Sequence, residues 1–305
     1  MVISDSGRYA ELHALSNFTF LRGASHPEEL VEEAVQLGYD ALAITDECSM
    51  SGVVRAHAAA KEFGLRKLII GSELRLHSGR KLIVLAQNRR GYAALCRLIT
   101  NARRAAGKGL YELTRLDFEE GLPDCLVLWV PDQGFTLDVE DHWIRETFRD
   151  RLWIAVELLA DGRQREQLTK LREEGRRLNL PLVAAGDVHM HCRSRRILQD
   201  AVTAIRHGTT IDNAGFALYP NGERHLRPLD VLRHIYPADM LEETARIADT
   251  IDFSLDELCY TYPKEIVPQG ETPATYLRTL TEEGMQRRWP QGVPDKVIRI
   301  VEHEL

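Results

Sequence analysis

Side chains able to bind metals or transfer protons stand directly after short apolar runs in the first two hundred residues. They are His13, the pair Asp46 and Glu47, Glu73, and the run Asp187-x-His189, with His191 two residues further on. Imidazole nitrogens and carboxylate oxygens gathered together suit zinc or manganese. Such ions lower the pKa of bound water and hold phosphoryl oxygens, so the set predicts phosphoester hydrolysis. A single His or Asp after a strand is more typical of a hydrogen-bonded loop, so the prediction depends on the whole set converging.

The elements that would position these residues alternate between strands and helices. Apolar or β-branched runs predict seven strands, at Tyr9–Leu15, Ala41–Thr45, Lys67–Ile70, Lys81–Ala86, Cys125–Val130, Leu152–Leu158 and Pro181–Ala185. Stretches of helical period lie between most of them, at Pro27–Leu37, Met50–Phe63, Arg89–Ala105, Gln164–Leu178 and Arg193–Arg206, with one weaker helix expected within Gly134–Asp150. Ser25 and Glu28 would form the capping box of the first helix. The alternation predicts an α/β fold with a parallel sheet.

The positions of the polar residues favour a closed barrel over a doubly wound open sheet. Four of the predicted strands lead into candidate ligands. In a barrel the carboxyl ends of all the strands meet at one mouth, where active sites form. In an open sheet the same residues would be spread along an edge. We therefore expect a barrel with its site at that mouth.

The chain changes character after Asn213. A loop is expected at Gly215–Arg227 and an extended linker at Tyr260–Gly270. Helices are expected at Leu229–Ile235, at Ala238–Ile251, at Thr272–Trp289 with Thr272 as cap, and from Pro294 to the end. The last helix has no Gly or Pro stop signal, so we expect the chain to be a fragment cut inside or just after this helix.

Composition narrows the class of protein. In 305 residues, 39 Lys and Arg stand against 46 Asp and Glu, and the net charge of −7 does not fit a stand-alone nucleic-acid-binding protein. Basic clusters remain at Arg89-Arg90, at Arg103-Arg104 with Lys108, and at Arg193 to Arg196. They are typical of solvated faces, and the alternative is contact with nucleic-acid phosphates. No apolar run could span a bilayer, and no secretory signal is present. Five scattered cysteines without a C-x-x-C pair indicate a reducing, cytoplasmic environment.

Several segments make the chain recognisable. YAELHALSNFTFLRGASHPEELVEEAVQLGYDALAITDECSMSGVVRAHAAAKEFGLRKLIIGSEL resembles the start of the PHP (polymerase and histidinol phosphatase) domain of bacterial DNA polymerase III α subunits. KLIVLAQNRRGYAALCRLIT and LPLVAAGDVHM are similar to the same family, and ITDECSMSG and GDVHMHCRSRR look more like its error-prone members. VPQGETPATYLRTLTEEGMQRRW looks like the entry into the polymerase palm. The resemblance implies a distorted seven-stranded (βα) barrel followed by a short helical segment.

The resemblance also implies a ligand set, of which this chain keeps only part. Active PHP domains of the family use nine ligands around up to three metal ions. His13 matches the first His of the family's H-x-H motif, Glu73 matches the family Glu, and Asp187 and His189 match its D-x-H motif. Glu47 replaces the His of the family's T-D-H. These five residues are the candidate residual metal ligands, for one zinc or manganese ion or for none.

Four family ligands are lost. Leu15 takes the place of the second His of H-x-H, Arg22 of an Asp, Lys81 of a His and Pro131 of a Cys. A cation at such a place repels a metal ion, and it can pair with the carboxylates that remain. We therefore expect a degenerate site in which salt bridges stand in for ions.

The function implied is that of the N-terminal PHP region of an error-prone, translesion DNA-directed DNA polymerase. The expected divisions are residues 1–212 as the barrel core, 213–270 completing the PHP region and 271–305 as the start of the palm. No pair of polymerase carboxylates is found, so no catalytic residue is assigned, and the magnesium of the polymerase site would be held elsewhere in the parent protein. DNA and other mutasome proteins are the partners that the resemblance implies. Two alternatives stay open: a metal-dependent phosphoesterase or 3′–5′ exonuclease with a reduced site, and a histidinol-phosphatase-like enzyme.

Overall fold

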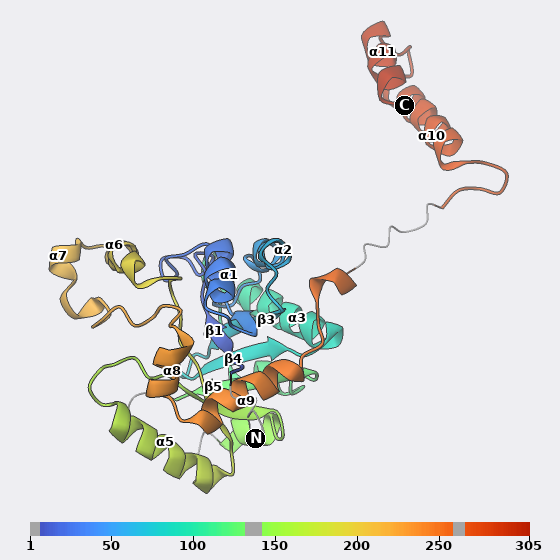
Figure 1. The fold of residues 1–305 in the computed structure, drawn as a ribbon. Coiled ribbons are helices and arrows are strands. Elements are labelled where there is room, and N and C mark those ends of the chain that lie inside the picture. Colours follow the sequence, from blue (N-terminus) through green and yellow to red (C-terminus); the bar gives the residue numbers. More distant parts are fainter. Residues whose placement is uncertain (1–6, 132–141, 259–265) are drawn as a thin grey trace. The chain divides into compact units, whose positions relative to one another are not determined.

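The computed structural model describes residues 7–131, 142–258 and 266–305, and the chain divides into two compact units, Met1–Leu258 and Cys259–Leu305 (Figure 1). The first unit contains the seven predicted strands. Their bounds are β1 Ala10–Ala14, β2 Ala41–Ile44, β3 Lys67–Arg75, β4 Lys81–Ala86, β5 Cys125–Val130, β6 Leu152–Val156 and β7 Leu182–Ala184. They form one sheet in the order β1-β2-β3-β4-β5-β6-β7.

The two edges of this sheet are joined just beyond β7. The amide of Val188 donates to the carbonyl of His13 at 2.9 Å, and the amide of Leu15 donates to the carbonyl of Val188 at 2.7 Å. The sheet is therefore a nearly closed seven-stranded barrel, as the sequence predicts.

The expectation of a wholly parallel sheet is wrong for one strand. β4 runs antiparallel to both of its neighbours, β3 and β5. The reason is that no helix separates β3 from β4: β3 continues to Arg75, and a short turn with Gly79 at φ +88° leads straight back. A connection this short can only return antiparallel. As a result Lys81, the first residue of β4, lies opposite Arg75 at the end of the barrel where the parallel strands finish.

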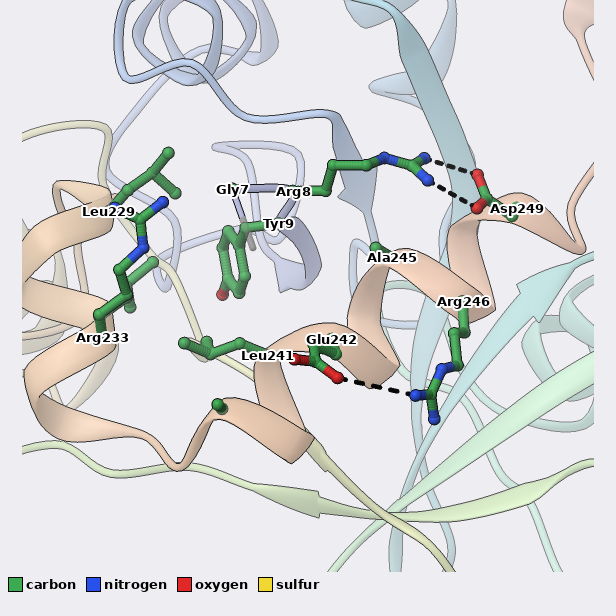
Figure 2. A pocket seen from close by; sticks show the side chains of 12 residues that line it. Gly7, Arg8, Tyr9, Leu229, Arg233, Leu241, Glu242, Ala245, Arg246 and Asp249 are labelled. Carbon is green, nitrogen blue, oxygen red and sulfur yellow. Dashed lines mark hydrogen bonds and ion pairs between the residues drawn. The ribbon is translucent and has the colours of Figure 1, made fainter. Parts of the chain in front are cut away.

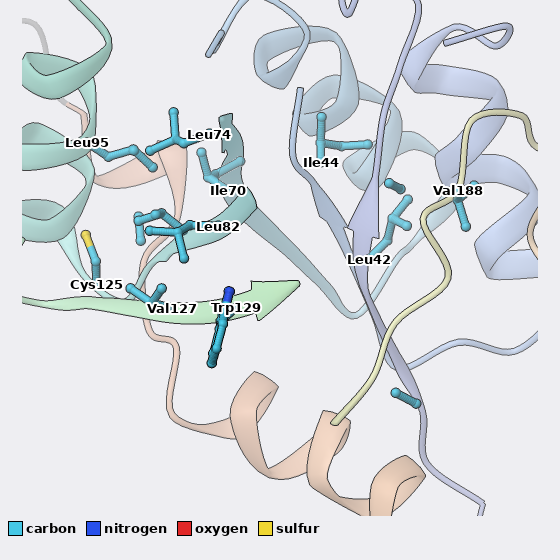
Figure 3. Close-up of a cluster of buried hydrophobic side chains, with 14 of the residues drawn as sticks. Leu42, Ile44, Ile70, Leu74, Leu82, Leu95, Cys125, Val127, Trp129 and Val188 are labelled. Carbon is cyan, nitrogen blue, oxygen red and sulfur yellow. The ribbon is translucent and has the colours of Figure 1, made fainter. Parts of the chain in front are cut away.

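Side chains alternate between the inside and the outside of the barrel, because successive residues of a strand point to opposite faces. The inner cluster includes Leu12, Ala43, Ile69 and Ile83, together with residues of helix α9 (Ala238–Asp249). The outer cluster packs under the surrounding helices. Figure 3 shows part of it: Leu42, Ile44, Ile70, Leu74, Leu82, Leu95, Cys125, Val127, Trp129 and Val188.

Most helices of the first unit pack around the barrel or close one end of it, whereas α6 and α7 extend away from it (Figure 1). They are α1 Pro27–Gln36, α2 Val53–Phe63, α3 Arg89–Ala105, α4 His142–Thr147, α5 Gln164–Leu178, α6 Arg196–Arg206, α7 Ile211–Ala214, α8 Leu229–Ile235 and α9 Ala238–Asp249. All the helices predicted in this unit are confirmed, with ends that differ by a few residues. Helix α4 lies within the segment where one weak helix is predicted, and residues 132–141 of that segment lie outside the described residues. The predicted loop Gly215–Arg227 contains only the short 3₁₀ turn Gly215–Ala217.

The predicted capping box of α1 is wrong by one residue. Glu29, not Glu28, accepts the backbone N–H of His26 at 2.9 Å, and His26 is the N-cap. Pro27 occupies the first helical position, so the cap must be the residue before it. The Ser25 hydroxyl is instead within 2.9 Å of His191 Nδ1.

The second unit contains helices α10 Pro273–Arg288 and α11 Asp295–Glu304. The Thr272 hydroxyl caps α10 as predicted, accepting the amide of Thr275 at 3.3 Å. Part of the predicted linker, residues 259–265, lies outside the described residues. The divisions at residues 212 and 270 stay predictions. No helix in the described part of the chain is long and apolar enough to cross a membrane, and the four described cysteines are free thiols.

Candidate metal site at the barrel mouth

Six residues from five strands or strand ends meet at the mouth of the barrel. His13 belongs to β1 and Glu73 to β3, Lys81 opens β4, and Glu157 follows β6. Asp187 and His189 follow β7. The alternation of side chains explains the choice of residues. Ala155 and Ala185 face the inside of the barrel, and Glu157 and Asp187 follow them by two positions, so they point to the same side.

His13 is the centre of the group. Its Nε2 atom lies 3.0 Å from Glu73 Oε2, and its Nδ1 atom lies 2.9 Å from Glu157 Oε1 and 3.6 Å from Asp187 Oδ1. His189 Nε2 lies 3.2 Å from the same Asp187 oxygen. His13, Glu73 and Asp187 are all buried, and each offers a ligand atom within 4.8 Å of the other two. These three residues could hold a metal ion.

Cationic side chains already pair with the carboxylates of the mouth. Arg22 is 5% exposed and binds Glu73 with both terminal nitrogens, at 2.7 and 3.2 Å. It also forms an ion pair with Glu47. Lys81 Nζ lies 3.3 Å from each oxygen of Glu157.

Asp187 is paired in the same way. Arg224 forms an ion pair with it, and Lys81 Nζ is 4.0 Å from its Oδ2 atom. The Arg224 guanidinium also lies over the ring of Tyr219, 4.4 Å from its centroid. Each carboxylate that could bind a metal here therefore has a cationic partner.

Glu47 lies outside the His13 triad. Its Oε1 atom accepts the Tyr111 hydroxyl at 2.8 Å, and its backbone carbonyl accepts a guanidinium N–H of Arg103 at 3.1 Å. Its carboxylate is joined to the mouth through Arg22 and, at 4.0 Å, through Arg75. The structure thus brings four of the five predicted ligands together and holds the fifth at the rim.

Two other residues of the predicted set point elsewhere. Asp46 faces the loop after β1: its Oδ1 atom accepts the Ser16 amide at 2.8 Å and the Thr19 hydroxyl at 2.7 Å, and its Oδ2 atom accepts the Ser16 hydroxyl at 2.7 Å. It follows the outward-facing Ile44 by two positions, so the alternation turns it away from the mouth. His191 is bound to Ser25 and is not part of the triad.

The charged partners set the protonation of the mouth. Burial opposes ionisation of Glu73, but Arg22 and His13 outweigh it and hold the pKa of Glu73 well below its usual range. Burial is likewise outweighed by Lys81 and His13 at Glu157, whose pKa falls to about 2. Burial and Arg22 lower the pKa of His189, so its ring is neutral.

Three participants were not predicted from the sequence. Glu157 directly follows the sixth strand, as the other candidate ligands follow or end theirs, so a signal for it existed in the sequence. Arg75 follows Glu73 by two residues, and its Nε atom donates to Glu73 Oε1 at 3.0 Å. Arg224 comes from the loop before α8, and nothing in the sequence pattern indicates that this loop reaches the mouth.

The larger of two described cavities lies away from this chemistry. It measures about 820 Å³ and lies between α8, α9 and the residues that lead into β1 (Figure 2). Two pairs of its charged side chains bind each other, Arg8 with Asp249 at 2.7 Å and Arg246 with Glu242 at 3.7 Å. A cavity of about 230 Å³ is lined by Glu157 and Arg224 and lies beside the mouth. The side-chain chemistry, and not the cavity size, therefore places the candidate site at the mouth.

Comparison with known proteins identifies what the chain resembles. Residues 11–128 match the PHP domain family. An error-prone DNA polymerase from Methylococcus capsulatus is 56% identical over 306 residues, covering 100% of this chain and 29% of the relative. An error-prone DNA polymerase from Dechloromonas aromatica is 55% identical, covering 97% of this chain and 29% of the relative. A solved amidohydrolase from Chromobacterium violaceum has 15% identity and a TM-score of 0.44, covering 60% of this chain and 88% of that one.

The chain therefore carries a PHP domain, and along its whole length it is similar to error-prone DNA polymerases. The resemblance seen in the sequence is confirmed. The chain spans about 29% of the length of the curated relatives that it matches.

Proposed function

We propose that this chain is the PHP region of an error-prone DNA polymerase and that its barrel mouth is a structural, ion-paired substitute for a metal cluster. One observation carries the proposal: the buried guanidinium of Arg22 binds both oxygens of Glu73 and also pairs with Glu47. These contacts occupy the carboxylate oxygens that a metal would need.

The charges of the mouth balance without an ion. Four cations, Arg22, Arg75, Lys81 and Arg224, meet four carboxylates, Glu47, Glu73, Glu157 and Asp187. Unpaired buried charge is costly, and such pairing removes that cost. A divalent ion entering this arrangement would face the repulsion of cations a few ångströms away and would have to displace them. The residues present therefore do not fit a cluster of two or three ions.

One observation favours a second function. His13, Glu73 and Asp187 have ligand atoms within 4.8 Å of one another. Zinc or manganese bound there would supply a Lewis acid and an acidified water, the chemistry of a phosphoesterase or 3′–5′ exonuclease with a reduced site. In that case Arg22 and Lys81 would have to leave their present partners.

Metal content separates the two functions. Protein purified without chelator should contain well under one equivalent of zinc or manganese by elemental analysis. It should not turn over a phosphomonoester or a 3′-labelled oligonucleotide. Two or more tightly bound ions per chain, with turnover abolished in His189→Ala, would overturn the proposal and favour the phosphoesterase.

A variant gives an independent test of the ion-pair argument. Arg22→Asp removes the guanidinium and adds a carboxylate next to Glu73, so zinc affinity measured by calorimetry should rise at least tenfold. Arg75→Gln is the matched control, because Arg75 also contacts Glu73 but is 47% exposed. Equal affinities in the wild-type protein and both variants would contradict the proposal.

The parent's activity is proposed from the relatives. It would be template-directed nucleotide addition with magnesium in translesion synthesis, in the cytoplasm, with DNA and mutasome proteins as partners. No pair of palm carboxylates was identified in the sequence, so the 305-residue chain should not extend a primer with magnesium or manganese. Template-dependent extension that survives further purification would show that a polymerase site was overlooked.

A further inference from the structure

The charged residues of helix α3 are all positive, and no acidic residue on the helix neutralises them. Its sequence, RRGYAALCRLITNARRA, contains five arginines and no acidic residue. This is unexpected in a chain of net charge −7. Figure 1 shows α3 on the outside of the barrel, and its buried residues, Leu95, Leu98 and Ala102 among them, form its inner face.

Three of the arginines form a row along the solvent face. Arg90, Arg97 and Arg104 are seven residues apart and all exposed. Seven residues return to nearly the same face of a helix, with a drift of about 20°, and advance by about 10.5 Å. The row is therefore almost straight. Arg89 and Lys108 are exposed near its two ends.

The row is largely free of protein partners. Arg90 lies 3.3 Å from Asp124 but is 81% exposed. Arg97 and Arg104 take part in no ion pair among the residues that the structure describes. Arg103 is different: it donates to the carbonyls of Glu47 and Cys48, so it serves the fold and is not counted in the row.

Helix α5 shows what an ordinary basic helix looks like in this protein. It carries five Lys and Arg residues but also three glutamates. Lys170 pairs with Glu166 at 2.7 Å, and Arg177 pairs with Glu174 at 2.5 Å. Two of the five positive charges on α5 are thus neutralised on the helix itself, as expected for a solvated face. Those on α3 are not.

We propose that Arg90, Arg97 and Arg104 bind the phosphate backbone of duplex DNA. Successive phosphates of one strand advance by about 3.4 Å along the duplex axis while winding around it, so a row about 21 Å long spans about six base-pair steps. Long arginine side chains can reach several phosphates over that length, and guanidinium binds phosphate in bidentate fashion. The choice of DNA over an acidic protein rests on the proposed function, because a DNA polymerase region acts beside DNA.

The expected binding is weak and salt-dependent. Three phosphate contacts give a slope of log affinity against log salt of about −3, and most of the molecule is acidic. Binding to the 305-residue chain should therefore be micromolar or weaker at physiological salt, and the row would guide DNA already held by the rest of a polymerase.

The test measures fluorescence anisotropy of a labelled 20-base-pair duplex of mixed sequence from 20 to 150 mM salt. Arg90→Gln/Arg97→Gln/Arg104→Gln should weaken binding at least tenfold at low salt and bring the slope close to zero. The matched control is Arg165→Gln/Arg176→Gln/Arg177→Gln on α5, which removes the same charge from exposed positions and should have little effect. Gln retains helix propensity, and circular dichroism checks both variants.

Two results would overturn the inference. One is an equal loss of binding in the α3 and α5 variants, which would mean that only total charge matters. The other is displacement of the duplex by a 20-residue polyglutamate peptide as effectively as by unlabelled duplex, which would indicate an acidic protein partner. Metal content does not enter this measurement. Tightly bound ions at the mouth would overturn the proposed function and leave this result standing.

Discussion

Two buried carboxylates at the same end of the barrel are held in opposite ways. Glu73 lies among charges, with both oxygens bound by Arg22 and one by His13. Asp46 lies among neutral groups, and its oxygens accept the amide and hydroxyl of Ser16 and the hydroxyl of Thr19. The two sites are adjacent, since the amide of Glu73 donates to the carbonyl of Thr45 at 2.9 Å.

The consequence for ionisation is opposite as well. Cations hold the pKa of Glu73 well below its usual range, whereas burial raises the pKa of Asp46 although Thr19 and Ser16 donate to it. A place after a buried strand therefore does not define a role. The role of each carboxylate depends on its partners. Cations make the carboxylates of the mouth part of an ion-paired network, whereas hydroxyl groups make Asp46 an anchor for the loop after β1.

The largest expected effect breaks the network at its centre. Arg22→Leu leaves Glu73 and Glu47 without their main partner, and removing one member of a buried ion pair typically costs about 3–5 kcal/mol. Urea denaturation at pH 7 in the presence of chelator should show a loss of this size. Arg75→Leu, at a side chain that is 47% exposed, should cost less than about 1 kcal/mol. Similar small losses in both variants would mean that the network contributes little to folding.

Acid should break the ion pairs of the mouth by protonating their carboxylates, whereas it should not weaken the Asp46 site in this way. The pKa of Glu157 is about 2 in the folded protein, because Lys81, His13 and Arg224 outweigh burial, against about 4.3 when unfolded. The ionised Glu157 therefore adds on the order of 3 kcal/mol to the free energy of unfolding. This stabilisation is present above about pH 4.3 and is lost as the pH falls through about 2. The pKa of Asp46 is raised on folding, so its ionisation lowers the free energy of unfolding as the pH rises, which is the opposite of the effect of Glu157.

Denaturation midpoints from pH 7 to pH 2.5 in chelator check this dependence. Glu157→Gln should be less stable at pH 7 and should have a flatter profile below about pH 4.5. Asp46→Asn should not flatten that profile. An unchanged acid profile in Glu157→Gln would mean that other carboxylates set the acid limit.

The sequence predicts the barrel well, because strand burial and helix period are local signals. All seven strand positions follow from apolar runs, and the N-cap at Thr272 follows from Pro273. The antiparallel direction of β4 was not predicted. The short segment around Gly79 could have indicated it, because a connection without a helix forms a hairpin and not a crossover.

The site is predictable only to the extent that it depends on strand ends. His13, Glu73, Asp187 and His189 were found this way, and Glu157 could have been. Whether Asp46 or Glu47 turns toward the cations of the mouth depends on whether an odd or an even number of residues separates it from β2, because a shift of one residue exchanges the two faces. Arg224 reaches Asp187 by tertiary packing of a loop, which leaves no local pattern in the sequence.

The smallest and most direct test compares two amide substitutions. Asp46→Asn keeps an oxygen that can accept from Ser16 and Thr19, so it should cost no more than about 1 kcal/mol. Glu73→Gln removes the charge that balances Arg22, so it should cost at least about 1 kcal/mol more, because a hydrogen bond survives but the ion pair does not. Equilibrium unfolding of both variants at pH 7 in chelator measures the difference. Equal costs would mean that hydrogen bonding alone holds both carboxylates, and the distinction between a charged mouth and a neutral anchor would fall.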